Sequence, residues 1–187
     1  VMISPEMEFY AFNKIEDSYT QIKENEGYFI PPPLDKAKNY RKKLSDGLMV
    51  CGYQVKYHHH ETSKSQHEIE VKAMDALKAA DFCSYFKYAA RDIAAMFNME
   101  ITFMPKPFSQ EAGSGMHAHI ALYKNGSNMF ADENDSMGLS QTARYFIGGV
   151  LEHSRGIAAL ANPTLNSYKR LIPHYEAPIY IAWAPHN

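Results

Sequence analysis

The chain has 187 residues, of which 45% are hydrophobic and 21% charged, a composition that indicates one folded domain and excludes a disordered chain. Its formal net charge of -2 and pI near 6.5 leave no basic excess, so we expect no nucleic acid among its partners. No apolar stretch approaches the roughly 20 residues that span a bilayer, so we expect no membrane partner either.

The cysteines and the two ends of the chain bear on the class of protein. Cys51 and Cys83 are too few for a disulfide framework and lack CxxC spacing. We therefore expect both to be buried thiols of a cytoplasmic protein. The chain opens at Val1 rather than at Met and stops just after an apolar run, which favours a piece cut from a longer polypeptide.

The first part of the chain predicts a strand, a loop and a helix. Carboxylate and apolar side chains alternate over residues 6–12, which is the period of a half-buried strand. Three consecutive prolines require a loop over residues 30–34. Residues 35–49 have helical periodicity, with Asp35 placed as the N-cap and Gly52 following the end.

The middle of the chain predicts a hairpin and then a long helix. Residues 54–60 and 67–71 are the expected strands, joined by the polar segment 61–66. A helix of about six turns follows, because apolar residues recur there at helical spacing. Its expected apolar stripe comprises Met74, Leu77, Phe82, Phe86, Ala89, Ile93 and Met96.

Three more strands and a second long helix complete the predicted fold. The strands cover residues 101–104, 116–122 and 177–183, and the helix covers residues 139–160. Short strands interleaved with long helices predict an α+β domain, in which a curved, mainly antiparallel sheet carries long helices on one side. A parallel βαβ array is the alternative, but the short connection between the two hairpin strands argues against it.

Two pairs of alternating polar side chains are candidates for a binding site. Glu6 and Glu8 project from one face of the first strand, about 6.6 Å apart along the chain, which suits a hard cation. Two solvated glutamates explain this pattern equally simply. His117 and His119 likewise share a face, after a Gly-Ser-Gly segment whose amides can approach an anion. A tight turn explains these glycines as well.

The predicted hairpin carries a further group of polar residues. Three histidines, His58 to His60, run directly into Glu61, and Glu68 and Glu70 follow on the next strand. The hairpin can direct Glu61 and Glu68 inward as metal ligands, whereas a partly buried histidine tract is the simpler interpretation.

Oxygen ligands with one histidine favour Mg²⁺ or Mn²⁺ over zinc. The candidate ligands are Glu6, Glu8, Glu61, Glu68 and His117. Because one Mg²⁺ usually takes fewer ligands from protein, the set indicates a two-metal phosphoryl-transfer site. A later loop, residues 162–176, carries Lys169, Arg170 and Glu176, which suit a small zwitterion or a phosphate. A polar surface loop is the alternative.

In this order, the motifs resemble those of the glutamine synthetases, and most of all the type I-like members. The matching segments are residues 6–8, 59–68, 103–107, 113–119, 162–170 and 175–178. They span nearly the whole chain. The resemblance implies that residues 1–187 form a partial catalytic domain, without the amino-terminal domain and the carboxy-terminal tail of the family.

The resemblance also implies roles for individual residues. Two or more divalent ions, Mg²⁺ or Mn²⁺, would be bound at each site. The implied ligands are Glu8, Glu61 and Glu68 for one ion, and Glu6 and His117 for another, which also takes a later Glu that this chain lacks. Gly113 and Arg170 would contact glutamate, and Glu176 would close the site and help remove a proton from ammonium. His119 would face the nucleotide phosphates.

The activity implied by the resemblance is the ATP-dependent ligation of ammonia to the γ-carboxyl of glutamate through γ-glutamyl phosphate, in a homo-oligomer. We expect this chain alone to bind metal weakly and to be inactive. Lys56, Ala112 and His174 depart from the family pattern at an acidic residue, an asparagine and a glycine, and Ser65 replaces another glycine. These departures leave open an amine or polyamine acceptor, and a non-catalytic relative is the third alternative.

Overall fold

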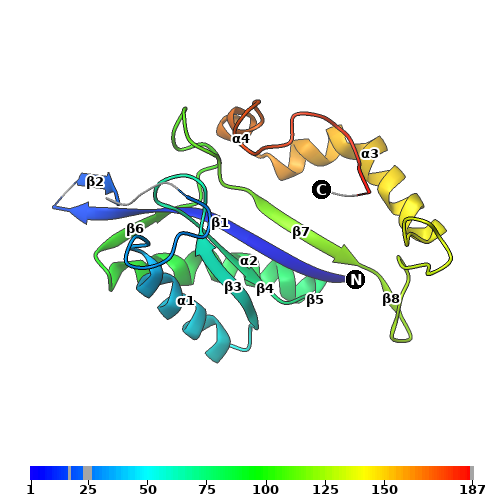
Figure 1. Ribbon diagram of the computed structural model, residues 1–187, viewed down its shortest axis with the longest axis horizontal. Coiled ribbons are helices and arrows are strands. Elements are labelled where there is room, and N and C mark those ends of the chain that lie inside the picture. The colour runs from blue at the N-terminus through cyan, green and yellow to red at the C-terminus, as the bar shows by residue number, and fades with distance from the viewer. Residues whose placement is uncertain (17, 23–26, 186–187) are drawn as a thin grey trace.

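The computed structural model describes residues 1–16, 18–22 and 27–185, and its centre is one long strand (Figure 1). This strand, β1 (Met2–Ile15), pairs with β2 (Ser18–Gln21), β4 (Gln66–Val71), β5 (Met74–Asp75), β6 (Met99–Thr102) and β7 (Met116–Ala121). β3 (Val55–His60) pairs with β4 at the edge. Every pairing is antiparallel, so the predicted α+β class with an antiparallel sheet is confirmed.

The alternation of side chains along β1 divides the sheet into a core face and a polar face. Met7, Phe9 and Ala11 are buried in the core, whereas Glu6 and Glu8 project from the opposite face. The core face is covered by the helices α1 (Lys38–Val50) and α2 (Ala76–Ala95). The ring of Phe9 lies 6.0 Å from the rings of both Tyr40 on α1 and Phe86 on α2, measured between centroids.

Helix α1 begins later than predicted, and Asp35 is not its N-cap. Ala37 takes that position without a side-chain hydrogen bond. The Asp35 carboxylate instead forms a buried ion pair with Arg41, whose Nη1 lies 3.1 Å from Oδ1. A buried guanidinium requires such a partner, and this requirement outweighs capping. Gly52 follows the helix with φ +84°, as predicted.

Helix α2 is confirmed, but its apolar stripe is narrower than predicted. Asp75 caps the helix by accepting a hydrogen bond from the backbone N–H of Lys78 at 3.0 Å. Phe82 and Phe86 are buried, whereas Leu77 and Met96 are exposed. Leu77 points away because it lies five residues before Phe82, about 140° around the helix, and Met96 lies beyond the last turn.

The last third of the chain lies apart from the α1–α2 layer. The hairpin β8 (Tyr123–Lys124) and β9 (Ser127–Asn128) leads to α3 (Gln141–Ala161) and the short α4 (Leu165–Arg170), which lie above β1 and β7 in Figure 1. The predicted strand 177–183 is wrong, because no described strand pairs with this segment. Among the described helices, none combines the length and the apolar character needed to cross a membrane.

The prediction for the cysteines is wrong for Cys51, which is exposed, and Cys83 is only half-buried. Cys51 follows the last residue of α1 at the surface, where its Sγ lies 3.0 Å from the hydroxyl of Tyr85. Position at a helix end, rather than residue type, decides its exposure.

Candidate metal and substrate site

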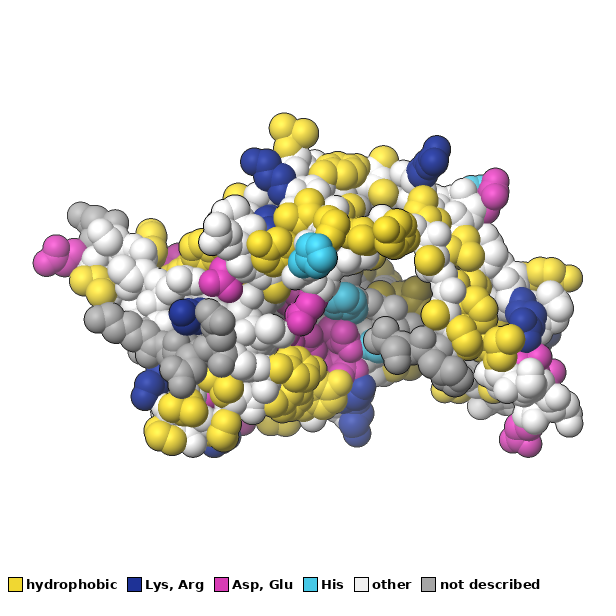
Figure 2. Space-filling view, turned by 45° about the horizontal axis from the view of Figure 1, so that its top comes forward, with side chains coloured by type: hydrophobic (Ala, Val, Ile, Leu, Met, Phe, Trp, Pro, Cys, Tyr) yellow, Lys and Arg dark blue, Asp and Glu magenta, His cyan; other side chains and the backbone are white. Residues whose placement is uncertain are grey.

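The predicted metal ligands come from three strands and, for Glu61, from the turn after β3, and they meet on the polar face of the sheet. Glu6 lies opposite Glu70 of β4 on one side and opposite His117 of β7 on the other. Glu8 lies opposite Glu68. Residues directly opposite in antiparallel strands project from the same face, so these side chains form one group. Figure 2 shows Glu and His side chains gathered in the hollow at the centre of the molecule.

The two histidines of β7 contact the two glutamates of β1. His117 Nε2 lies 2.9 Å from Glu8 Oε1, and His119 Nε2 contacts the Glu6 carboxylate. The resemblance paired His117 with Glu6, which agrees with the backbone register but not with the side-chain contacts. The carboxylate of Glu8 also accepts a hydrogen bond of 2.8 Å from the backbone N–H of Gly115.

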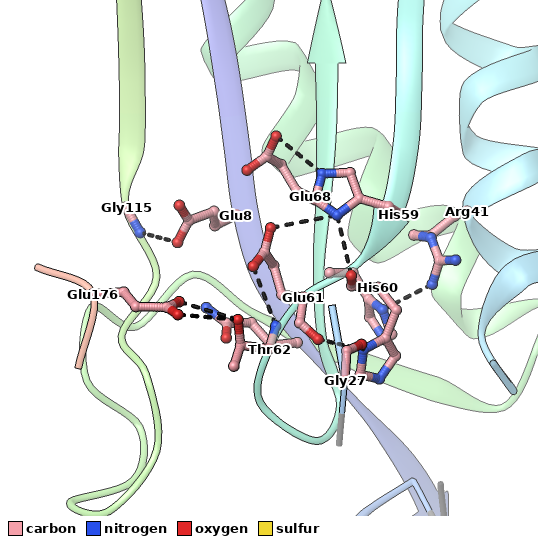
Figure 3. A network of polar contacts seen from close by, with 12 residues as sticks. Glu8, Gly27, Arg41, His59, His60, Glu61, Thr62, Glu68, Gly115 and Glu176 are labelled. Atoms are coloured by element: carbon pink, nitrogen blue, oxygen red, sulfur yellow. Dashed lines mark hydrogen bonds and ion pairs between the residues drawn. The ribbon is translucent and has the colours of Figure 1, made fainter. Parts of the chain in front are cut away.

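The β3–β4 hairpin adds His59, which the sequence reasoning did not select. Its ring lies between two carboxylates, with Nδ1 3.4 Å from Glu61 Oε1 and Nε2 3.4 Å from Glu68 Oε1 (Figure 3). The ring of Phe29 stacks on it with centroids 4.0 Å apart. Strand parity was the available signal, because His59 and Glu61 are two residues apart and His59 lies opposite Glu68.

Burial and mutual repulsion shape the charge state of this cluster. Burial raises the pKa of Glu61 to about 7; His59 opposes this shift, and the neighbouring charges of Glu68 and Glu8 add to it. Burial would also raise the pKa of Glu8, but hydrogen bonds from His117 and Gly115 hold it below its usual value. A bound cation would therefore stabilise this crowded group of carboxylates.

The cluster offers two groups of ligand atoms that suit hard cations. In each group the candidate atoms lie within 4.8 Å of one another, and each contains two carboxylates and one imidazole. The groups are His59, Glu61 and Glu68, and Glu6, Glu70 and His119. Glu8 and His117 bond to each other beside them. This donor chemistry fits Mg²⁺ or Mn²⁺, since oxygen atoms predominate.

Metal affinity is expected to depend on pH through Glu61. A metal ligand must be deprotonated, and the Glu61 pKa of about 7 means that a bound ion must displace a proton below that pH. We expect the apparent affinity for Mn²⁺ to rise about tenfold between pH 6 and pH 8, as calorimetric titration would measure. Glu61→Gln should remove most of this dependence. An affinity independent of pH would contradict the assignment of Glu61 as a ligand.

Two glycines let the loop before β7 approach Arg170 closely. A Cβ on Gly113 would overlap the carbonyl oxygen of Pro105 and lie 2.6 Å from Arg170 Cγ. A Cβ on Gly115 would lie 2.5 Å from Arg170 Nη2. The loop is anchored at Gly113, whose carbonyl accepts a hydrogen bond of 3.1 Å from Gln66 Nε2. These glycines therefore create space for the guanidinium.

Arg170 is the last residue of α4, and two nitrogen atoms of its guanidinium lack a hydrogen-bond partner. Its Nε and Nη2 atoms are buried and make no hydrogen bond to any described residue. They face a cavity of about 450 Å³ whose lining includes Glu8, Ser114, Gly115 and Thr164. Buried guanidinium donors are costly to leave unpaired, and their fork geometry matches a carboxylate or a phosphate. The cavity is therefore suited to a small anionic ligand.

Glu176 approaches the cluster from the last described segment. Its carboxylate accepts hydrogen bonds of 3.1 and 3.3 Å from the hydroxyl of Thr62, the residue after Glu61 (Figure 3). The backbone N–H of Thr62 donates to Glu61 Oε2 at 3.2 Å. Thr62 thus joins Glu176, across 114 positions of sequence, to the β3–β4 hairpin.

The whole chain, residues 1–187, matches the family model described as the glutamine synthetase catalytic domain. The chain belongs to the glutamine synthetase family. Among its relatives, the glutamine synthetase of Pyrococcus horikoshii is 46% identical over 100% of this chain and 42% of its own length. The enzyme of Halobacterium salinarum is 45% identical with the same coverage. The chain thus spans about two fifths of these glutamine synthetases.

Solved structures of the family have the same fold. The chain is similar to the glutamine synthetase of Plasmodium falciparum, with a TM-score of 0.86 and 32% identity over 94% of this chain and 40% of that one. It is also similar to ligand-free GmaS, with a TM-score of 0.83 and 29% identity over 91% of this chain and 41% of that one. These matches show that the chain has the fold of this part of a glutamine synthetase.

Proposed function

We propose that the protein carrying this chain ligates ammonia to the γ-carboxyl of glutamate, using ATP and passing through γ-glutamyl phosphate. The observation that supports this most is the cavity shared by Arg170 and Glu8. It places unpaired guanidinium donors beside a carboxylate cluster that suits divalent cations. The α-carboxylate of glutamate matches the guanidinium donors. The phosphoryl group that passes to its γ-carboxylate matches the cation site.

The residues of the chain have distinct proposed roles in this reaction. Arg170 Nε and Nη2 would donate to the α-carboxylate of glutamate, next to the backbone of Gly113. The proposed ligands of Mg²⁺ or Mn²⁺ are Glu6, Glu8, Glu61, Glu68 and His117. The ions would neutralise phosphate charge when bound. His119 would face the nucleotide phosphates. These groups orient the γ-carboxylate of glutamate for attack on the γ-phosphorus of ATP.

Glu176 would act in the second half of the reaction. Ammonium must lose a proton before nitrogen can attack the acyl phosphate and release phosphate, and the Glu176 carboxylate can accept that proton. Its hydrogen bonds to Thr62 hold it beside the hairpin that carries Glu61. A segment that covers the site there would keep water from the acyl phosphate.

We place this activity in a longer polypeptide, because the chain spans 42% of its relatives. We predict that residues 1–187 alone, as one partial catalytic domain, bind metal weakly and have negligible activity. A homo-oligomer and a cytoplasmic location also remain predictions. The oligomer rests on the family resemblance, and the cytoplasmic location rests on the small number of cysteines.

The acceptor is tested by phosphate release from ATP and glutamate in the polypeptide that carries this chain. Ammonium should support rapid release, and polyamines should not. Stronger release with a polyamine would favour the amine ligase, which Ala112 and His174 motivate as departures from the family pattern. No release with either acceptor, in a protein that still binds Mn²⁺, would favour a non-catalytic relative.

A further inference from the structure

Lys56 is placed at the end of the carboxylate cluster by a β-bulge. Val55 pairs with Val71 and Tyr57 pairs with Glu70, so the register shifts at Lys56, which is the extra residue. A bulge redirects a side chain, and here the Lys56 ammonium forms an ion pair with Glu70. The family resemblance implies an acidic residue in place of Lys56, and an acidic residue could not form this ion pair.

The partner of Lys56 is a fully buried carboxylate. The side chain of Glu70 has no exposed surface, and Ser4 Oγ donates to its Oε1 at 3.3 Å. Its Oε2 is buried without a hydrogen-bond partner among the described residues. Glu70 is therefore a buried anion that depends on a nearby cation.

Glu70 belongs to a ligand group that shares Glu6 with one of the two ions of the proposed function and adds two residues outside their ligand sets. Ligand atoms of Glu6, Glu70 and His119 lie within 4.8 Å of one another. The group has the composition of a divalent cation site, and the free Oε2 atom of Glu70 is the buried acceptor that such an ion would use. The Lys56 ammonium places one compact positive charge beside the same Glu70 carboxylate.

We propose that the Lys56 ammonium is a built-in cation that keeps a further divalent ion from binding between Glu6, Glu70 and His119. Two negative charges lie in this group, and Lys56 balances one of them permanently, whatever the metal concentration. Glu6 retains a second carboxylate oxygen for the ion that it shares with His117 in the proposed function. The proposal rests on that function only in taking divalent ions as ligands of the cluster.

The number of Mn²⁺ ions bound per chain tests the proposal. Equilibrium dialysis with electron paramagnetic resonance detection should count one more Mn²⁺ in Lys56→Met than in the parent protein. Lys56→Arg, which keeps the charge, should bind the parent number. Adding Glu70→Gln to Lys56→Met should return the count to the parent value, because Glu70 lies outside the ligand set of the proposed function.

Lys78→Met is the matched control. Lys78 Nζ lies 5.5 Å from the ring centroid of Tyr53, as Lys56 Nζ lies 5.5 Å from that of Tyr57, but no described carboxylate pairs with it. Its Mn²⁺ count should equal that of the parent protein.

An unchanged count in a folded Lys56→Met protein would overturn the proposal. Lys56→Gln, which keeps a hydrogen-bond donor for Glu70, gives the same test if Lys56→Met does not fold. Failure of the proposed function would give a different result. The Glu61→Gln variant would then bind Mn²⁺ as the parent protein does.

Discussion

Replacing Glu61 by Gln is expected to weaken Mn²⁺ binding about 100-fold, or ~2.7 kcal/mol. Gln has nearly the same shape but removes the negative charge from a group in which Glu61, Glu68 and His59 offer ligand atoms within 4.8 Å. The retained amide oxygen is a weaker ligand for a hard cation. Calorimetric titration with Mn²⁺ at pH 8, where Glu61 is mostly ionised in the parent protein, measures the difference.

Glu152→Gln is the control for this substitution. Glu152 is exposed on α3 and makes no ion pair to any described residue, so the same chemical change should leave Mn²⁺ affinity unaltered. Equal affinities in Glu61→Gln and the parent protein would count strongly for a relative of the family that keeps the fold but has lost catalysis.

Gly113→Ala is expected to lower kcat/KM for glutamate about 100-fold. The added Cβ would overlap the Pro105 carbonyl oxygen, which is backbone and cannot rotate away, and would press on Arg170 Cγ. The Arg170 guanidinium would then move from the position that we assign to the α-carboxylate of glutamate. Steady-state phosphate release at varied glutamate concentration measures the effect in the polypeptide that carries this chain.

Gly148→Ala is the matched control, since a Cβ on Gly148 meets no atom within 4 Å. Gly148 lies inside α3, where Ala in place of Gly should stabilise the protein by roughly 0.5–1 kcal/mol and leave kcat/KM unchanged. Mn²⁺ affinity should be close to the parent value in both variants. Parent-like kcat/KM in Gly113→Ala would contradict the role given to the Arg170 loop.

Two departures from the family pattern share a backbone property. Ser65 has φ +65° and His174 has φ +72°, and the family resemblance has glycine at both positions. Glycine adopts this left-handed region without steric cost, whereas other residues adopt it less readily. The structure therefore gives a conformational reason for glycine at these positions, and it shows that Ser65 and His174 adopt the left-handed region themselves.

Much of the fold followed from local sequence patterns. The alternation around Glu6 and Glu8 predicted the strand and the face from which both project, and the segments 54–60 and 67–71 were found as paired strands. Such patterns are visible because strand side chains have a period of two and helix side chains a period of 3.6. The failed strand at 177–183 shows the limit, since a strand also needs a partner.

Only the tertiary structure decided which side chains meet. Periodicity gives the face of a strand, but register depends on pairing between segments that lie far apart in sequence. It therefore could not show that His119 contacts Glu6, that His59 lies between Glu61 and Glu68, or that a bulge turns Lys56 toward Glu70. The sequence by itself determined the family and the antiparallel sheet, whereas long-range packing decided which polar side chains meet and how their pKa values shift.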